Sequence, residues 1–160
     1  MRKIIKILFV TCVVMGLFGC AGSQKEQRTV CKSSMSYFGC TISSIIEYNH
    51  KEDNIISRNQ DTVIKAKNKE VYNVLKEKYK SLDLSSRFNR SEGIKYLLKF
   101  DNVKQEINEN LKIDLEHISE DEYKFLLHHK LCVKKSNTYF SLKKTLEDMK
   151  TSDFTCCKVY

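Results

Sequence analysis

The first twenty residues constrain this chain most, because they separate a processing segment from everything that can fold. Three basic residues, Arg2, Lys3 and Lys6, give the segment a positive start, and an uncharged run then continues to Gly19. This order is typical of a secretory signal peptide. The run is also too short to cross a bilayer comfortably, which takes about 20 apolar residues. We therefore expect residues 1–19 to be a signal peptide that is removed on export.

The end of this segment adds a second expectation. Leu17-Phe18-Gly19-Cys20 resembles the lipobox of bacterial lipoproteins, in which an aliphatic and a small residue precede a cysteine. The resemblance covers residues 1–20 only. It implies that the chain is cut before Cys20, that Cys20 carries a thioether-linked diacylglycerol, and that its new amine takes a further acyl chain such as palmitate. Several acyl chains on one residue would make attachment to the lipid bilayer practically permanent.

The same resemblance implies a location. A lipoprotein of this class is held in the cell envelope, and Ala21 after Cys20 implies the outer membrane in a Gram-negative cell, with the folded part in the periplasm or at the surface. The compartment would be oxidising, so that the cysteines of the body are expected to form disulfides.

Seven cysteines make the pairing an open question. Cys12 lies in the signal and Cys20 is the expected lipid site, which leaves Cys31, Cys40, Cys132, Cys156 and Cys157. Five cysteines cannot all pair within one chain, so at least one must be free, intermolecular or otherwise attached. The expected pairs are Cys31–Cys40, and Cys132 with either Cys156 or Cys157. Because neighbours in a strand point to opposite faces, the unused member of Cys156-Cys157 is expected to be exposed or to pair with Cys31 or Cys40.

Residues 20–34 are small and polar, and we expect them to form a tether to a single small domain over residues 35–160. β-Branched residues gather in 41–48, and a polar stretch separates them from 54–57. This pattern favours a hairpin, with a short helix as the alternative.

Helical periodicity dominates the middle of the chain. Apolar residues recur every three or four positions from Ile64 to Leu82, which predicts a helix beginning near Asp61. Similar stripes predict helices over 91–100 and 102–118. The remaining expectations are a helix over 119–130 that starts with a Ser119–Glu122 capping box, a hairpin from 131–133 and 138–142, a helix over 142–150 and a closing strand over 154–160. The expected fold is mainly α, with about four helices, a small antiparallel sheet near the C-terminus and disulfide staples.

Composition narrows the possible functions. The formal net charge of +8 includes the three basic residues of the signal, so that its removal leaves +5, which favours solubility more than a nucleic-acid partner. Only Gly22, Gly39 and Gly93 follow the signal, too few for a glycine-rich phosphate-binding loop. Most nucleotide-binding enzyme classes are excluded on that ground.

No residue pattern selects a catalytic centre. His128 and Cys132 stand four apart, and with His117 and Cys156 or Cys157 they could be imagined as a zinc site or a cysteine–histidine catalytic pair. No C-x-x-C motif supports either. We therefore expect a non-enzymatic envelope lipoprotein, without cofactor or metal, that contacts another protein in an exclusion, envelope-accessory or host-contact role. The alternative is a small envelope enzyme that uses a Cys/His or zinc site.

Overall fold

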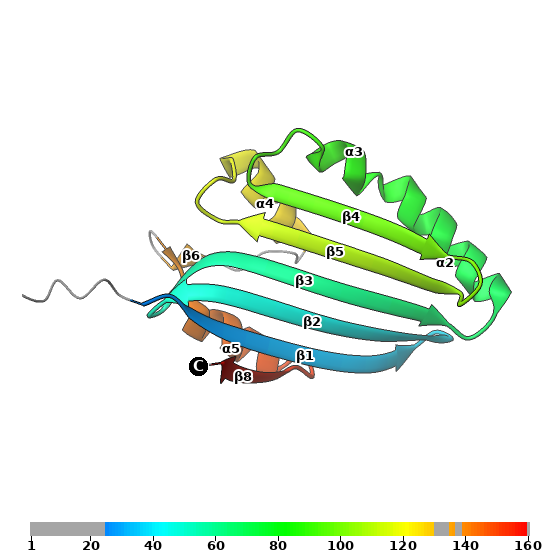
Figure 1. The fold of residues 1–160 in the computed structure, drawn as a ribbon, viewed down its shortest axis with the longest axis horizontal. Coiled ribbons are helices and arrows are strands. Elements are labelled where there is room, and N and C mark those ends of the chain that lie inside the picture. The colour runs from blue at the N-terminus through cyan, green and yellow to red at the C-terminus, as the bar shows by residue number, and fades with distance from the viewer. Residues whose placement is uncertain (1–24, 130–134, 137–138, 160) are drawn as a thin grey trace, which may run out of the picture.

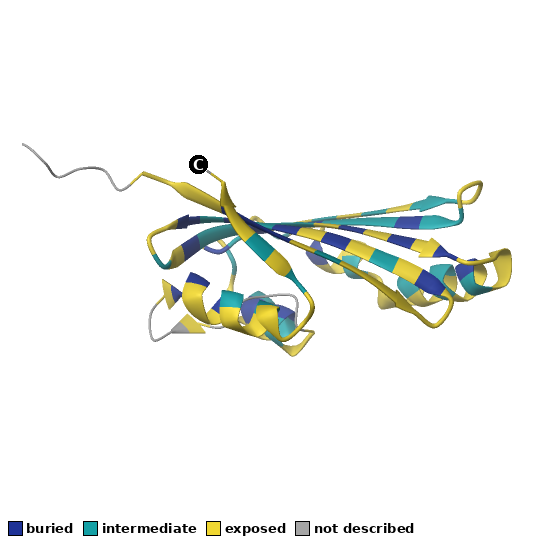
Figure 2. Ribbon diagram, turned by 90° about the horizontal axis from the view of Figure 1, so that it is seen from below, coloured by how far each residue is buried: buried dark blue, intermediate teal, exposed yellow. Residues whose placement is uncertain are grey.

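A six-stranded antiparallel sheet organises the described part of the chain, and the helices lie on one of its faces (Figures 1 and 2). The computed structural model describes residues 25–129, 135–136 and 139–159. The strand order is β4-β5-β3-β2-β1-β8. These strands are β1 (Gln27–Tyr37), β2 (Cys40–Lys51), β3 (Asn54–Ala66), β4 (Ile94–Asp101), β5 (Glu106–Asp114) and β8 (Thr155–Val159). The helices are α2 (Lys69–Leu82), α3 (Leu84–Phe88), α4 (Glu120–His128) and α5 (Leu142–Lys150), and a two-stranded ribbon joins β6 (Lys135–Ser136) to β7 (Tyr139–Phe140).

Alternation of side chains decides which face of the sheet the helices cover. In β2 every second residue from Cys40 to His50 is buried or half-buried, as expected for a strand with one face against a core. The register with β1 and β3 places their matching residues on the same face. We call this the inner face, and the opposite one the outer face.

The inner face carries two separate apolar clusters. The larger one packs under α3, α4 and α5, and the smaller one packs under α2. Buried members of the larger cluster include Cys31, Ile46, Tyr48, Ile55, Phe88, Ile94, Leu111, Ile113, Tyr123, Leu126, Phe140 and Leu142. Buried members of the smaller one are Cys40, Ile64, Ala66, Tyr72 and Ile107. Each cluster holds its own helices against the sheet.

The expectation of a mainly α fold is wrong. Residues 94–101 and 106–114, expected within two helices, form the hairpin of β4 and β5. The expected helix from Asp61 begins only at Lys69, with Asn68 as its N-cap, because residues 61–66 finish β3. The sheet is therefore built mainly from the first two-thirds of the chain rather than near its C-terminus.

The expected tether is too long. Residues 27–34 of the segment expected to link lipid and domain belong to β1, which pairs with β2 along its whole length. The folded part of the chain thus begins at least as early as Gln27.

Several local expectations are confirmed. The segments 41–48 and 54–57 lie in the β2–β3 hairpin, α4 starts with the Ser119–Glu122 capping box, and α5 covers 142–150. The closing strand is β8. The expected strand 131–133 lies outside the described residues, and the short ribbon of β6 and β7 follows it. Within the described part of the chain no helix is long and apolar enough to span a membrane.

Candidate functional site

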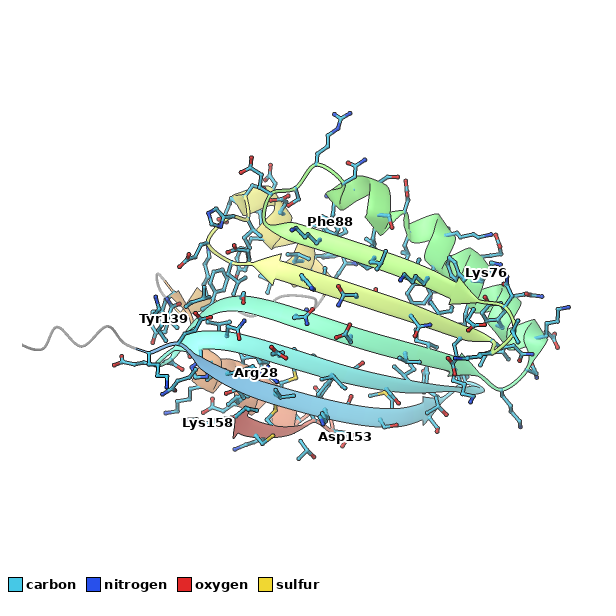
Figure 3. All side chains as sticks on the ribbon, viewed as in Figure 1. Arg28, Lys76, Phe88, Tyr139, Asp153 and Lys158 are labelled. Atoms are coloured by element: carbon cyan, nitrogen blue, oxygen red, sulfur yellow. A yellow bond between two sulfur atoms is a disulfide. The ribbon has the colours of Figure 1, made fainter. Side chains whose placement is uncertain are left out.

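The long sheet has two ends with different surroundings (Figure 1). The proximal end holds the start of β1 at Gln27, the β2–β3 turn and the end of β8 at Val159. The distal end holds three connections: the β1–β2 turn (38–39), the β3–α2 link (67–68) and the β4–β5 turn (102–105). Figure 3 shows Arg28, Tyr139 and Lys158 toward the proximal end and Lys76 toward the distal one.

A disulfide joins the edge strand β8 to β1, and it differs from the two preferred pairs, although pairing of Cys31 with one of Cys156-Cys157 was the alternative. Cys31 of β1 is bonded to Cys156 of β8, directly opposite it in the register. The expected Cys31–Cys40 pair is therefore wrong, and Cys156 is not available to Cys132. A local pair across the β1–β2 turn looked favourable in the sequence because its closing loop is short, but the sheet brings β8 beside β1.

The other cysteines take different environments. Cys40 is a buried free thiol whose Sγ donates to the Tyr37 carbonyl oxygen, 2.9 Å away. Cys157 is free and exposed, on the face opposite to Cys156, as expected for neighbours in a strand. Cys20 and Cys132 lie outside the described residues.

Two histidines of the described chain, His50 and His117, contact neighbouring polar groups. His50 is buried, with Nε2 3.1 Å from the Thr29 hydroxyl and Nδ1 2.7 Å from the Glu52 carbonyl oxygen. His117 contacts the Asp114 carboxylate at 2.9 Å, which raises its pKa. Over residues 25–129, 135–136 and 139–159 no three metal-ligating side chains come together. Because Cys156 forms a disulfide, its sulfur cannot serve as a thiolate ligand in the zinc site considered from the sequence.

The distal end is a fixed platform. Hydrogen bonds tie its three connections to one another: Lys67 N–H donates to the Gly39 carbonyl (2.8 Å), and Ala66 N–H to the Gln105 carbonyl (3.0 Å). Asn102 Oδ1 accepts from the Tyr72 hydroxyl and the Lys76 ammonium, both at 2.9 Å, which fixes the β4–β5 turn on α2. Side chains on this platform are therefore presented in defined positions.

Apolar side chains project from this platform into solvent. Phe38 is 81 % exposed, Val103 92 % and Tyr37 60 %, and the rings of Tyr37 and Phe38 meet edge to face with centroids 4.1 Å apart. Beside them lies a surface pocket of about 510 Å³, formed by the β1–β2 turn and by Lys65, Ala66 and Lys67. We call these exposed side chains and the pocket the distal tip.

The backbone of Phe38 is strained. Phe38 has φ 45° and Gly39 has φ 76°, the combination of a two-residue type I′ turn, whose first position normally holds Asn, Asp or Gly. A bulky residue with positive φ is an outlier that costs about 1–2 kcal/mol. Because the Phe38 ring is mostly exposed, burial within this chain does not offset that cost. Phe38 is the aromatic one of five non-glycine residues with positive φ in the described chain.

A row of polar side chains crosses the inner face between the two apolar clusters. Ser33, Ser44, Thr62 and Glu109 occupy directly opposed positions on β1, β2, β3 and β5. The Ser44 and Thr62 hydroxyls are 3.2 Å apart, and Gln60 Nε2 donates to Thr62 Oγ1 at 2.9 Å. We call these four residues the polar row.

Arg58 and Tyr96 add charge and a phenol to the row. Arg58 is 5 % exposed and donates through Nη2 to Gln60, whereas its Nη1 has no hydrogen-bond partner among the residues that the structure describes. Tyr96 donates to Glu109 Oε1 at 2.8 Å. Burial raises the pKa of Glu109, and the Tyr96 hydrogen bond and the Arg58 charge oppose that rise. Burial also raises the pKa of Tyr79 to about 12, with the Glu109 charge adding to it.

Sequence reasoning missed both features. The polar row can be recognised only from the register of the strands, which residue spacing does not reveal. Its one signal in the sequence is Glu109, which interrupts an alternating apolar pattern from Ile107 to Ile113. The distal tip had a visible signal in Phe38-Gly39, an aromatic residue before a glycine between two strand-like segments.

Comparisons with known proteins identify the fold and no family. No protein-family model matches the chain, and no curated protein matches it. Among solved structures it is similar to the NMR structure of the E. coli YehR protein, with a TM-score of 0.59, 18 % identity, and 86 % of this chain and 95 % of that chain covered. It is also similar to the NMR structure of a protein from Streptococcus pneumoniae TIGR4, with a TM-score of 0.54, 12 % identity, and coverage of 88 % and 90 %. At these identities the likeness extends to the fold alone.

Proposed function

We propose that this protein is a bacterial envelope lipoprotein, held in the bilayer by acylated Cys20, that contacts another protein through its distal tip without catalysing a reaction. The observation that carries the proposal is Phe38, an exposed aromatic ring on a backbone position that costs stability. Burial against a partner would account for an exposed ring on a strained backbone position.

The position of the proposed anchor is consistent with a distal tip that faces away from the membrane. Gln27, the first residue of the sheet, follows Cys20 by seven residues, so the intervening chain spans at most about 25 Å. From there β1 runs for 11 residues, roughly 35 Å, to the distal tip. A domain held at Gln27 would therefore present the distal tip away from the membrane that carries the lipid.

The chemistry of the tip fits a protein partner. Exposed aromatic side chains on a rigid platform lose little conformational entropy on binding, and such residues are enriched at the centres of protein interfaces. The cysteines and histidines of the described chain provide no comparable arrangement for catalysis.

The anchor is tested by mass spectrometry of the mature N-terminus, which should show a lipid-modified Cys20. Cys20→Ala should leave the precursor uncut and unmodified. An intact signal, or an unmodified terminus at Ala21 or beyond, would contradict the anchor.

The contact is tested by Phe38→Asn, which should separate binding from folding. Because asparagine suits the first position of a type I′ turn, the variant should be more stable than the parent by about 1 kcal/mol in urea unfolding. In cells, a photoreactive benzoylphenylalanine in place of Tyr37 should cross-link a defined protein in the Phe38 background and lose that adduct in Phe38→Asn. Val74→Ala, which truncates an exposed apolar residue of α2, is the matched control and should leave the adduct unchanged. Absence of any adduct from position 37 would contradict the proposed function.

A further inference from the structure

Among the described residues, part of β1 next to the distal tip has no neighbouring strand on its outer edge. β1 contains 11 residues and pairs with β2 from Gln27 to Tyr37, but β8 pairs only with Arg28–Lys32. Residues 33–37 thus have a neighbouring strand on one side only within the described chain. Figure 1 shows β8 alongside only the first part of β1.

The direction of the backbone groups on this edge follows from the turn. In a two-residue hairpin the flanking residues, here Tyr37 and Cys40, exchange both hydrogen bonds, and alternate residues along the strand then point the other way. The N–H and C=O of Ser34 and Ser36 therefore point away from β2, toward the open edge. Together they offer two donors and two acceptors at the spacing of a β ladder.

This edge lacks the usual protection against pairing. Natural edge strands carry charged side chains, proline, bulges or a covering element that discourage strand addition. The segment Ser33-Ser34-Met35-Ser36-Tyr37 has neither charge nor proline, and its register with β2 runs without a shift. By contrast, β4 at the other edge carries Lys95, Lys99 and Asp101.

The side chains along the edge suit an added strand with alternating character. Met35 and Tyr37 belong to the inner face and are 40 % and 60 % exposed, so apolar side chains of an added strand would cover them. Ser34 and Ser36 lie on the outer face, where small or polar side chains fit. The edge ends at Phe38 and at the pocket beside it.

We propose that residues 33–37 accept an extended segment of a partner protein by β-strand addition, antiparallel to β1 and in line with β8. The inference rests on the proposed function, since it names how a partner engages the distal tip. The segment would be about five residues long, uncharged, with apolar side chains at alternate positions. A second copy of this chain fits less well, because five paired residues bury far less than the roughly 800 Å² per partner of a stable interface. An extended segment can continue past Tyr37 onto Phe38 and the pocket.

The test uses proline as a donor-specific probe in the full chain. Ser36→Pro removes one N–H from the open edge without removing a β1–β2 hydrogen bond, a position where edge strands tolerate proline. The cross-link from benzoylphenylalanine at position 37 should fall at least tenfold. Ser36→Ala, which keeps the N–H and removes only the hydroxyl, is the matched control and should stay within about twofold of the parent.

Two further readouts keep the outcomes distinct. If Ser36→Pro is not exported in folded form, Ser34→Lys places a charge on the same edge and should give the same loss. A parental adduct that survives both variants would overturn strand addition while leaving the distal-tip contact intact, whereas no adduct in the parent would overturn the contact itself. An adduct with the mass of two copies of this chain would show self-association and overturn the assignment of a partner segment.

Discussion

Cys31 and Cys156 lie opposite each other on neighbouring antiparallel strands, with Cα atoms 4.0 Å apart and their side chains joined. The bond spans 125 positions in the sequence and links the first strand of the sheet to the last. β8 has five residues and its side chains are mostly exposed, so packing alone holds it weakly. The disulfide thus carries much of the attachment of the C-terminal strand.

Removing this bond should lower the free energy of unfolding substantially. For a loop of this size, the chain-entropy model gives about 4–5 kcal/mol, the upper part of the range for disulfides. We expect that loss for the Cys31→Ser, Cys156→Ser double variant in urea unfolding, and for the parent in reductant. Cys157→Ser, which changes an exposed free thiol in the same strand, should shift the value by less than about 0.5 kcal/mol. Equal unfolding midpoints with and without reductant would contradict the role of the bond.

Glu109 should make the protein less stable as the pH rises. Burial raises the pKa of Glu109 above the 4.5 of an unperturbed glutamate, so between those two pKa values the folded state binds more protons than the unfolded state. The stability contributed by the neutral form is complete below the unfolded pKa and is lost as the pH rises through the folded one. Glu109→Gln should therefore be more stable than the parent near neutral pH, with the difference shrinking toward pH 4. Parallel stability curves for parent and variant from pH 4 to 8 would exclude this contribution.

Arg58 should lower the pKa of Glu109 across the polar row. The guanidinium is buried and its charge opposes the rise that burial causes. Arg58→Met, of similar length and without charge, should move the carboxyl titration of Glu109 to higher pH in carbon-detected NMR. Arg28→Met changes a half-exposed arginine paired with Glu47 and serves as the control that should leave the titration in place. An unchanged midpoint in Arg58→Met would show that the two charges do not interact.

Asp53 should fasten the C-terminal part of the chain to the β2–β3 turn. Its carboxylate accepts from Lys143 N–H (2.6 Å), Ser141 Oγ (2.7 Å) and Tyr139 Oη (3.2 Å). Asp53→Ala should cost about 1–2 kcal/mol in urea unfolding, as for a lost helix cap, and Asp53→Asn should cost less because its amide oxygen still accepts. A loss no larger than that of a surface substitution would contradict this role.

The same carboxylate gives the stability a dependence on acid. Burial raises the pKa of Asp53, but the three hydrogen bonds outweigh it and leave the pKa below 3.8. Its contribution is therefore present above the unfolded pKa and is lost as the pH falls through the folded one. The difference between Asp53→Ala and the parent should shrink in that acidic range.

The helical expectations failed where polar residues interrupt the strands. Ile107, Leu111 and Leu115 recur every four residues. Residues four apart lie on the same face of a helix and also on the same face of a strand, so this spacing does not distinguish the two. Ile113 continues a period of two from Leu111, but position 109, which would have extended it back to Ile107, is the glutamate of the polar row. In β4 the alternation of Ile94, Tyr96 and Leu98 was obscured by Leu97, an apolar side chain on the outer face.

Expectations that depend only on neighbouring residues were correct. The capping box at Ser119 and the β-branched run of β2 need only neighbouring residues, and both predicted their elements correctly. β1 was mistaken for a tether because its residues 32–36 are mostly polar, although it pairs along its whole length with the neighbouring β2. Its second partner, β8 at the distant C-terminus, could not be inferred from spacing. The disulfide was missed for the same reason, since it depends on that long-range pairing.

The arrangement of β1 also decides how the domain responds to mechanical load. A pull between the chain before Gln27 and the turn at Phe38 acts along the axis of β1, whose backbone is already extended, so that backbone carries the load and the pairing with β2 is not opened residue by residue. A tensile force between the two ends of the sheet would therefore act on an extended strand that can lengthen little, rather than on a hairpin that peels apart.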